Sequence, residues 1–376
     1  MFFNGRLFLR ALRLHFLGRR PTVRRWAYGI LFVTLFLSFR LVVRVGWGFD
    51  RVFFPGFRRQ PVRSPVFIIA PPRSGTTLTQ RLLGLDEERF IHWKLYQTIL
   101  PSITLQRLIA GIRRIDRWAG GALARLVGRV ERWGLGGWDG LHTMRLGQPE
   151  EDDALFLYAF ASEAAYLLFP YPRDLWELGF LDALPAGSRR RLTAHYRSCI
   201  QRQLFAHGGG RTLLSKATQS CGFVESLLEG FPDARFITIV RHPYKSVASH
   251  VSLFVPAWQR HSPEIAQDGP EAREYAELAV EWYRHLHAFR DRVPASQYHC
   301  IDYRELVQDP EATVRSVYRH FGWEVSETFA SRLREEAWRH RGFSSRHEYS
   351  LEAFGLSREW VQERLGPILE FHGLER

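Results

Sequence analysis

The sequence predicts an α/β fold in which a doubly wound parallel sheet carries a helical insertion and follows an N-terminal helical segment. Short apolar runs rich in β-branched residues alternate with helical patterns, which is typical of buried parallel strands. The length of 376 residues suits one large α/β domain with insertions. The first 63 residues are unusually basic and apolar, so we expect an N-terminal segment at 1–63, a domain at 64–376 and a helical insertion at about 86–210.

The composition indicates a folded protein with a preference for anionic partners. Hydrophobic residues make up 45% and charged residues 24%, which excludes wholesale disorder. The formal net charge of +13 favours a polyphosphate ligand, an acidic membrane surface or nucleic acid, although a high-GC genome that encodes Arg in place of Lys produces the same excess. Three cysteines without metal-ligand spacing indicate a reducing compartment, with neither a disulfide framework nor a metal.

The N-terminal segment is expected to interact with a membrane. Residues 1–25 contain seven arginines and no acidic residue, and an apolar run follows from Trp26 to Phe39. This run is shorter than the roughly 20 residues that cross a hydrocarbon core. We favour an amphipathic anchor in the interface of an anionic membrane, on its cytoplasmic side. Two alternatives stay open: a single span with Arg40 and Arg44 near one end, and a helix pair packed on the domain.

A turn with the features of an anion site follows the first predicted strand. Val66 to Ala70 is a short uncharged run that ends at two prolines, and a helical pattern begins at Thr76. A strand, a glycine-containing turn and a helix aim backbone N–H groups and the helix dipole at one phosphate or sulfate group. The turn lacks the lysine of a Walker A sequence, which disfavours a magnesium nucleotide triphosphate. The candidate binding residues are Arg73, Ser74, Gly75, Thr76 and Thr77.

A second anion site is predicted at another strand. Arg235 to Val240 is apolar, and Arg241 follows at the carboxyl end, where ligands bind in open parallel sheets. Ser249 lies one to two turns into the next predicted helix, from Tyr244 to Val255. The guanidinium and the hydroxyl are expected to converge on one phosphate.

These two segments resemble those of sulfotransferases that use 3′-phosphoadenosine-5′-phosphosulfate (PAPS). The letters PPRSGTTL are similar to the loop that binds the 5′-phosphosulfate, and Arg241 with Ser249 is similar to the segment that binds the 3′-phosphate. The resemblance implies a P-loop-like sheet, with Arg73 and the backbone of Ser74 to Thr77 holding the phosphosulfate end. It extends from about Val66 to the C-terminus and is specific only in these two motifs.

The resemblance implies roles for further residues. Lys216, at the end of a predicted strand from Thr212 to Ser215, is expected to reach the transferred sulfonate, and Tyr303 to contact the adenine. A C-terminal segment similar to that of a largely bacterial branch offers Arg341 and Arg346 as weaker candidates for the 3′-phosphate. Thr218 departs from the family pattern, because cytosolic members carry a histidine base two residues after the lysine.

The general base must therefore come from elsewhere. The acidic run at 150–153 offers Glu150 or Glu151, although a proline followed by acidic residues also starts helices well. His92 and Glu88 are rival bases.

The predicted function is transfer of a sulfuryl group from PAPS to a hydroxyl or amine of a small-molecule, lipid or saccharide acceptor. The alternatives are an ATP-dependent phosphotransferase with a P-loop and an inactive protein that binds a membrane surface. Nucleic acid is not an expected partner, because the arginines form no recognisable reading module.

Overall fold

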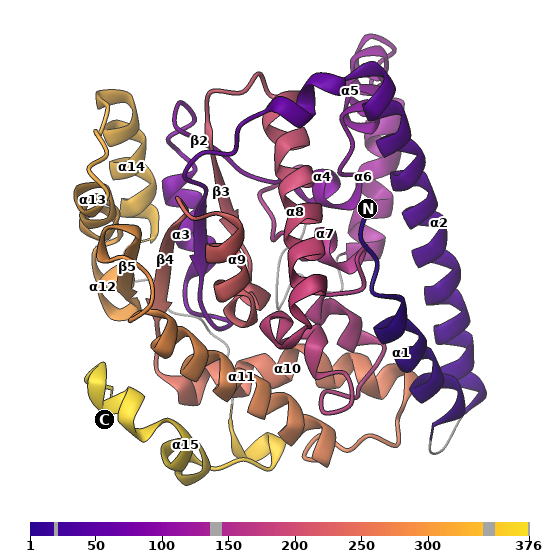
Figure 1. The fold of residues 1–376 in the computed structure, drawn as a ribbon, viewed down its shortest axis with the longest axis vertical. Coiled ribbons are helices and arrows are strands. Elements are labelled where there is room, and N and C mark those ends of the chain that lie inside the picture. The colour runs from indigo at the N-terminus through magenta and orange to yellow at the C-terminus, as the bar shows by residue number, and fades with distance from the viewer. Residues whose placement is uncertain (19–21, 136–144, 341–349, 375–376) are drawn as a thin grey trace.

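The structure is a computed structural model that describes residues 1–18, 22–135, 145–340 and 350–374 (Figure 1). Its centre is a sheet of five parallel strands in the order β2-β3-β1-β4-β5. The strands are β1 (Val66–Ile69), β2 (Phe90–Ile91), β3 (Thr212–Lys216), β4 (Arg235–Val240) and β5 (Tyr298–Asp302). The predicted α/β class and its parallel sheet are confirmed.

Helices surround this sheet and form a broad flank on one side of it (Figure 1). The α-helices are α1 (Gly5–Leu17), α2 (Val23–Phe53), α3 (Thr76–Leu83), α4 (Leu95–Ile99), α5 (Ile103–Trp118), α6 (Ala122–Leu135), α7 (Asp153–Leu157), α8 (Ala186–Ala206), α9 (Val224–Gly230), α10 (Pro243–His261), α11 (Pro270–Phe289), α12 (Tyr303–Gln308), α13 (Pro310–His320), α14 (Glu327–His340) and α15 (Arg358–Phe371). The 3-10 helices are η1 (Pro55–Arg59), η3 (Glu163–Leu167), η4 (Trp176–Leu178), η5 (Leu181–Ala183), η6 (Thr218–Gly222), η7 (Ala295–Gln297) and η8 (Glu352–Phe354).

Both faces of the sheet are buried, as in a doubly wound fold. Successive side chains of a strand point to opposite faces. Val66 and Ile68 of β1 belong to a core formed with α3, α12, α13 and α14. Phe67 and Ile69 belong to a larger core formed with α8 to α11 and with the N-terminal helices. This two-sided burial explains why the central strand β1 consists only of apolar residues.

The N-terminal helices pack on the domain along their length. One face of α2 is buried from Arg25 to Asp50, and the buried positions follow a helical spacing. Near the end of α2, the Asp50 carboxylate accepts a hydrogen bond of 2.9 Å from Nε of Arg202 in α8. The helix pair thus packs on the domain, as in one of the three arrangements considered above. α2 is also long and apolar enough to cross a membrane, and most of its apolar stretch faces outward.

The segment expected as a helical insertion has a more varied structure. It contains β2, a strand of the sheet itself, and a hairpin of α5 and α6 joined at Gly120 and Gly121, which both have positive φ. The apolar stretch at 151–169, read as helical, forms only α7 and η3, since the chain turns at Phe160 with φ +50°.

Candidate active site

The turn after β1 has the backbone conformation of an anion-binding loop. Arg73 and Gly75 both have positive φ, and Gly75 directly precedes the first residue of α3. A Cβ atom on Gly75 would lie 2.7 Å from a methyl carbon of Leu306 and 3.3 Å from the Tyr303 ring, so a side chain does not fit there. The first N–H groups of α3 lack partners within the helix and point out of its start, next to this turn.

Arg241 joins this loop to the adenine side of the predicted site. It follows the last residue of β4, and its guanidinium donates a hydrogen bond to the Arg73 carbonyl oxygen. The same guanidinium lies over the ring of Tyr303, with 4.2 Å between its carbon and the ring centroid. Tyr303 directly follows β5, so neighbouring strand ends bring together three residues that are far apart in the sequence.

Helix α10 is attached to the loop at its first turn. Ser246 donates a hydrogen bond of 2.8 Å to the Pro72 carbonyl oxygen. One turn later, Ser249 is fully buried, and its hydroxyl has no hydrogen-bond partner among the described residues. A buried hydroxyl without a partner is costly in free energy, so a ligand oxygen would satisfy it. The structure gives no direct contact between Ser249 and Arg241.

Lys216 lies at the centre of the carboxyl edge of the sheet. It is the last residue of β3, beside Ile68 of β1, and is therefore next to the loop. Its Nζ atom lies 3.2 Å from the Thr77 hydroxyl and 3.0 Å from Oε1 of Glu151. Burial lowers the pKa of Lys216, but the nearby carboxylates of Glu151 and Glu150 outweigh it and raise the pKa above its ordinary value. These carboxylates therefore favour the charged form of the lysine.

The acidic run is held in place by contacts on both sides. The Glu150 N–H donates to the Trp93 carbonyl oxygen at 3.0 Å, and one Glu150 carboxylate oxygen accepts from the Glu151 N–H. The Glu150 carboxylate lies 4.0 Å from Nζ of Lys216. The run leads into a helix only at its end: Asp152 is the N-cap of α7 and Asp153 is its first residue, and Glu150 and Glu151 precede the helix.

Asp152 is buried behind the lysine. Its carboxylate accepts hydrogen bonds from the hydroxyls of Tyr196 and Ser215. Burial raises the pKa of Asp152 to about 7, and the two hydrogen bonds oppose this shift. Burial and the Glu151 charge also raise the pKa of Asp153 well above its ordinary value. The acidic run therefore contains carboxyl groups in very different environments.

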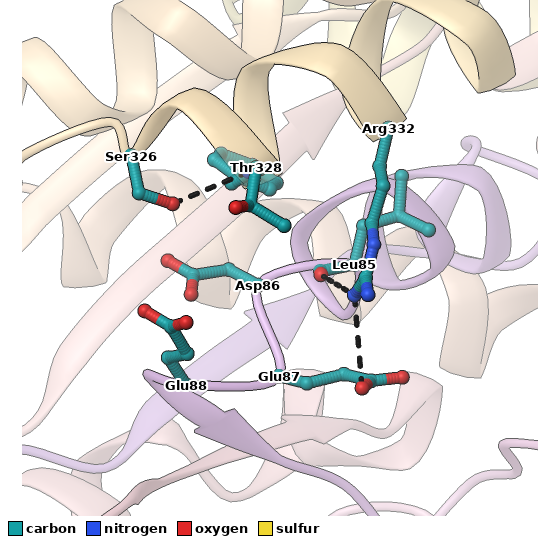
Figure 2. A pocket seen from close by; sticks show the side chains of 8 residues that line it. Leu85, Asp86, Glu87, Glu88, Ser326, Thr328 and Arg332 are labelled. Carbon is teal, nitrogen blue, oxygen red and sulfur yellow. Dashed lines mark hydrogen bonds and ion pairs between the residues drawn. The ribbon is translucent and has the colours of Figure 1, made fainter.

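The rival bases lie away from this cluster. Glu88 precedes β2, so it lies at the amino edge of the sheet, in a pocket with Glu87 and Arg332 (Figure 2). His92 follows β2, and burial lowers its pKa, with Lys94 and His207 as charged neighbours. Within the described part of the chain, Lys216 forms ion pairs with Glu150 and Glu151 and with neither of these two residues.

The sequence also singles out Thr218, Arg341 and Arg346. Thr218, which stands where cytosolic members carry a histidine base, is buried in η6, just after β3. Arg341 and Arg346 lie outside the described residues, so their role near the 3′-phosphate stays a prediction.

A buried cluster beside the site escaped the sequence reasoning. The Glu163 carboxylate lies 2.6 Å from Nε2 of His250 and accepts a hydrogen bond from Tyr275. The Glu163 N–H donates to the side chain of Gln219 in η6, at 3.0 Å. The cluster thus connects α10, which carries Ser249, to the segment after Lys216. Glu163 and His250 are 87 residues apart, and no local pattern in the sequence predicts their pairing.

The fold and the loop together place the chain among α/β proteins with a P-loop-like turn after the central strand. It belongs to the sulfotransferase family, whose sequence profile matches residues 65–327, and it is a sulfotransferase. The "Omega-hydroxy-beta-dihydromenaquinone-9 sulfotransferase Stf3" of Mycobacterium bovis and of Mycobacterium tuberculosis is 27% identical over 316 residues, which cover 83% of this chain and 76% of the relative.

Two solved structures share the fold. The sulfotransferase STF1 from Mycobacterium tuberculosis superposes with a TM-score of 0.68 at 20% identity, over 96% of this chain and 92% of its own. The sulfotransferase STF9 from Mycobacterium avium superposes with a TM-score of 0.68 at 21% identity, over 97% of this chain and 84% of its own.

Proposed function

We propose that this sulfotransferase takes its sulfuryl group from PAPS and transfers it to a hydroxyl or amine of an acceptor. Membership of the family supports the donor, and the residues fit it. Leu306 and Tyr303 leave no space for a side chain at Gly75, and the positive φ of this glycine leads the loop directly into the N-terminus of α3, which suits the 5′-phosphosulfate. The buried, unpartnered hydroxyl of Ser249, with Arg241 on the same edge, suits the 3′-phosphate.

The observation that carries the proposal is the position of Lys216 between the Thr77 hydroxyl and the Glu151 carboxylate. Sulfuryl transfer is expected to resemble phosphoryl transfer, in which positioning and cationic stabilisation dominate. The acceptor oxygen or nitrogen forms a bond to sulfur while the bond from sulfur to the bridging oxygen breaks. The electron pair of that bond remains on the 5′-phosphate, where Arg73 neutralises the new charge. Lys216 stabilises the negative charge on the sulfuryl oxygens in the transition state.

Glu151 is the proposed base, with Glu150 as its neighbour and alternative. The Glu151 side chain is 22% exposed and that of Glu150 is 9% exposed, so an acceptor reaches Glu151 more easily. When Lys216 turns toward the sulfonate, its ion pair with Glu151 weakens, and the carboxylate becomes available to take the acceptor proton. Both carboxylates stay candidates because each lies within 4.0 Å of the lysine.

The acceptor is proposed to be a hydroxylated lipid, with another small molecule or a saccharide as alternatives. The name of the relative Stf3 gives a hydroxylated menaquinone as the acceptor of that protein. Most aromatic side chains of the insertion are poor evidence for an apolar acceptor, because Phe156, Phe160 and Phe169 are fully buried in the core. A membrane-bound position on the cytoplasmic side, with α2 at the surface, accompanies this proposal.

Nucleotide binding and turnover test the proposal directly. We expect 3′-phosphoadenosine 5′-phosphate to raise the melting temperature of the full chain by several degrees and ATP with magnesium to raise it much less. The protein should also sulfate a promiscuous phenol in the presence of PAPS. Stabilisation by ATP alone, with no sulfated phenol, would favour a phosphotransferase. Binding of the nucleotide without sulfation of any of several hydroxyl or amine acceptors would favour an inactive binding protein.

A further inference from the structure

The hairpin of α5 and α6 carries an exposed apolar stripe. On α5, Leu108, Ile112 and Ile115 recur at helical spacing and are exposed, and Trp118 at its end is 92% exposed. On α6, the exposed apolar residues are Leu123, Leu126, Val127 and Val130. The exposed stripe thus runs along both helices of the hairpin. An apolar stripe of this length on a surface indicates a binding surface.

The stripe continues onto α2. Helices α2 and α5 are in contact, and they lie on the same flank of the molecule as α6 (Figure 1). The approach is close: a Cβ on Gly46 of α2 would lie 2.8 Å from the Ser102 hydroxyl at the start of α5. The outward side chains of α2 are also apolar, and they include Ile30, Leu31, Leu35, Leu37, Phe39, Leu41, Val42, Val45, Phe49, Val52 and Phe53.

The charges among these apolar residues are cationic. The hairpin carries seven arginines: Arg107, Arg113, Arg114, Arg117, Arg125, Arg129 and Arg132. Its two acidic residues are engaged with the backbone. The Asp116 carboxylate accepts hydrogen bonds of 2.8 Å from the N–H groups of Leu123 and Ala124, and the Glu131 carboxylate accepts one from the Leu146 N–H. Apolar side chains interleaved with arginines are complementary to an anionic lipid surface.

We propose that α2 and the α5–α6 hairpin form one docking face that lies in the interface of an anionic bilayer. The face is a surface and not a span, because the opposite side of α2 is packed on the domain from Arg25 to Asp50. A spanning α2 would have to leave that core and break the buried pair of Asp50 and Arg202. The docking face extends the membrane contact to a part of the chain far beyond residues 1–63.

The hairpin also connects this face to the active site. The segments before and after the hairpin are joined by hydrogen bonds from the Leu95 N–H to the Gln148 carbonyl and from the Tyr96 N–H to the Leu146 carbonyl, at 3.2 and 3.1 Å. Gln148 lies two residues before Glu150, so the chain that leads into the hairpin starts next to the acidic run. This connection goes beyond the proposed function, and the docking face does not depend on the identity of the donor or acceptor.

Vesicle flotation of the full chain tests the docking face. The hairpin variant combines Ile115→Ser with Trp118→Ser, which removes two exposed apolar side chains and no charge. Its matched control is Trp338→Ser, because Trp338 is 77% exposed but lies on α14, on the opposite flank (Figure 1). We expect the wild-type protein and the control to float with vesicles that contain phosphatidylglycerol at low salt. We expect the hairpin variant to bind them about tenfold less or weaker still.

Several results would overturn the docking face. One is equal flotation of the hairpin variant and the wild-type protein, with α2 alone then responsible for binding. Another is the absence of flotation for all three proteins. A third is a wild-type dimer in size-exclusion chromatography that the hairpin variant converts to a monomer, which would make a second copy the occupant of the face. Sulfation of a soluble phenol by the hairpin variant, at the wild-type rate, establishes that the fold and the chemistry are intact.

Discussion

The Nζ atom of Lys216, whose side chain is 1% exposed, lies 3.0 Å from Oε1 of Glu151. The same Nζ atom donates to the Thr77 hydroxyl in the first turn of α3. One cation thus connects the loop proposed for the donor with the carboxylate proposed for the acceptor proton. We therefore expect substitutions of the proposed base, of the proposed nucleotide-binding residues and of the buried residues that support them to have different effects.

Glu151→Gln is expected to lower kcat by roughly 10²–10⁴-fold, the usual worth of a general base. Affinity for 3′-phosphoadenosine 5′-phosphate should change by only a few-fold, since the carboxylate faces the acceptor. The measurements are sulfation of a phenol and calorimetric binding of the nucleotide. Glu150→Gln is the matched variant. If it has the larger loss of kcat, Glu150 is the base, and if both variants keep turnover within a few-fold, neither carboxylate is.

Arg241→Ala is expected to weaken binding of 3′-phosphoadenosine 5′-phosphate by on the order of 2–5 kcal/mol, because a phosphate loses a charged partner in a dry site. The variant also loses the hydrogen bond to the Arg73 carbonyl, so the loop loses one of its attachments to the rest of the domain. Arg319→Ala on α13 is the control for net charge, since Arg319 is exposed and distant from the loop. Calorimetry that finds equal affinity for both variants contradicts the 3′-phosphate assignment.

Asp152→Asn is expected to change how stability depends on pH. Burial raises the pKa of Asp152 in the folded state to about 7, above its ordinary value of 3.8. Between these two values the folded state binds a proton that the unfolded state has lost, so the wild-type free energy of unfolding falls as pH rises. The slope from one such group is about 1.4 kcal/mol per pH unit.

The Asn variant cannot titrate, so its stability should decline less steeply between about pH 4 and pH 7 than that of the wild-type protein. Its amide oxygen can still accept hydrogen bonds from Tyr196 and Ser215. Urea unfolding at several pH values measures the difference. Parallel curves for the two proteins would mean that Asp152 is ionised in the folded state over this whole range.

Asp50→Asn is expected to destabilise the protein by about 3–5 kcal/mol, because it leaves the Arg202 cation buried without its partner. The carboxylate oxygen that pairs with Arg202 also accepts a hydrogen bond from the Ile103 N–H at the start of α5, and an amide NH2 in its place cannot accept either bond. Glu335→Gln is the control, as it breaks the exposed pair with Arg339 and should cost at most about 1 kcal/mol. Equal unfolding midpoints for the two variants would contradict a structural role for α2.

The sequence predicts the parts of the site that a short continuous segment forms by itself. The loop at 73–77 follows a strand and starts a helix within a dozen residues, and each step has its own pattern in the sequence. Lys216 and Arg241 were found in the same way, because each ends or follows a short apolar strand. The bounds of β1, β3 and β4 agree with the expected ones to within a residue, because short runs rich in apolar residues mark strands buried on both faces.

The parts that escaped prediction depend on contacts between distant segments. The sequence does not predict which face of α2 is buried. Apolar residues lie on all sides of this helix, so their pattern does not indicate the side that packs on the domain. The pair of Asp50 and Arg202 spans 152 residues, and that of Glu163 and His250 spans 87. Pro149 pairs with Lys94 in a bridge, so the helix that the proline-acid pattern allowed begins only at Asp153.

The central place of β1 in the sheet separates the two halves of the chemistry along the chain. On one side of β1 lie β4 and β5, whose ends carry Arg241 and Tyr303, and on the other side lie β3 and β2. The long connection between β2 and β3 contains the hairpin and the acidic run. The strands β1, β4 and β5 lie before or after this connection in the sequence. Substitutions in the hairpin and the acidic run can therefore accumulate while the strand ends that carry Arg241 and Tyr303 keep their places. Enzymes that sulfate very different molecules could arise from one ancestral scaffold while its nucleotide half stays unchanged.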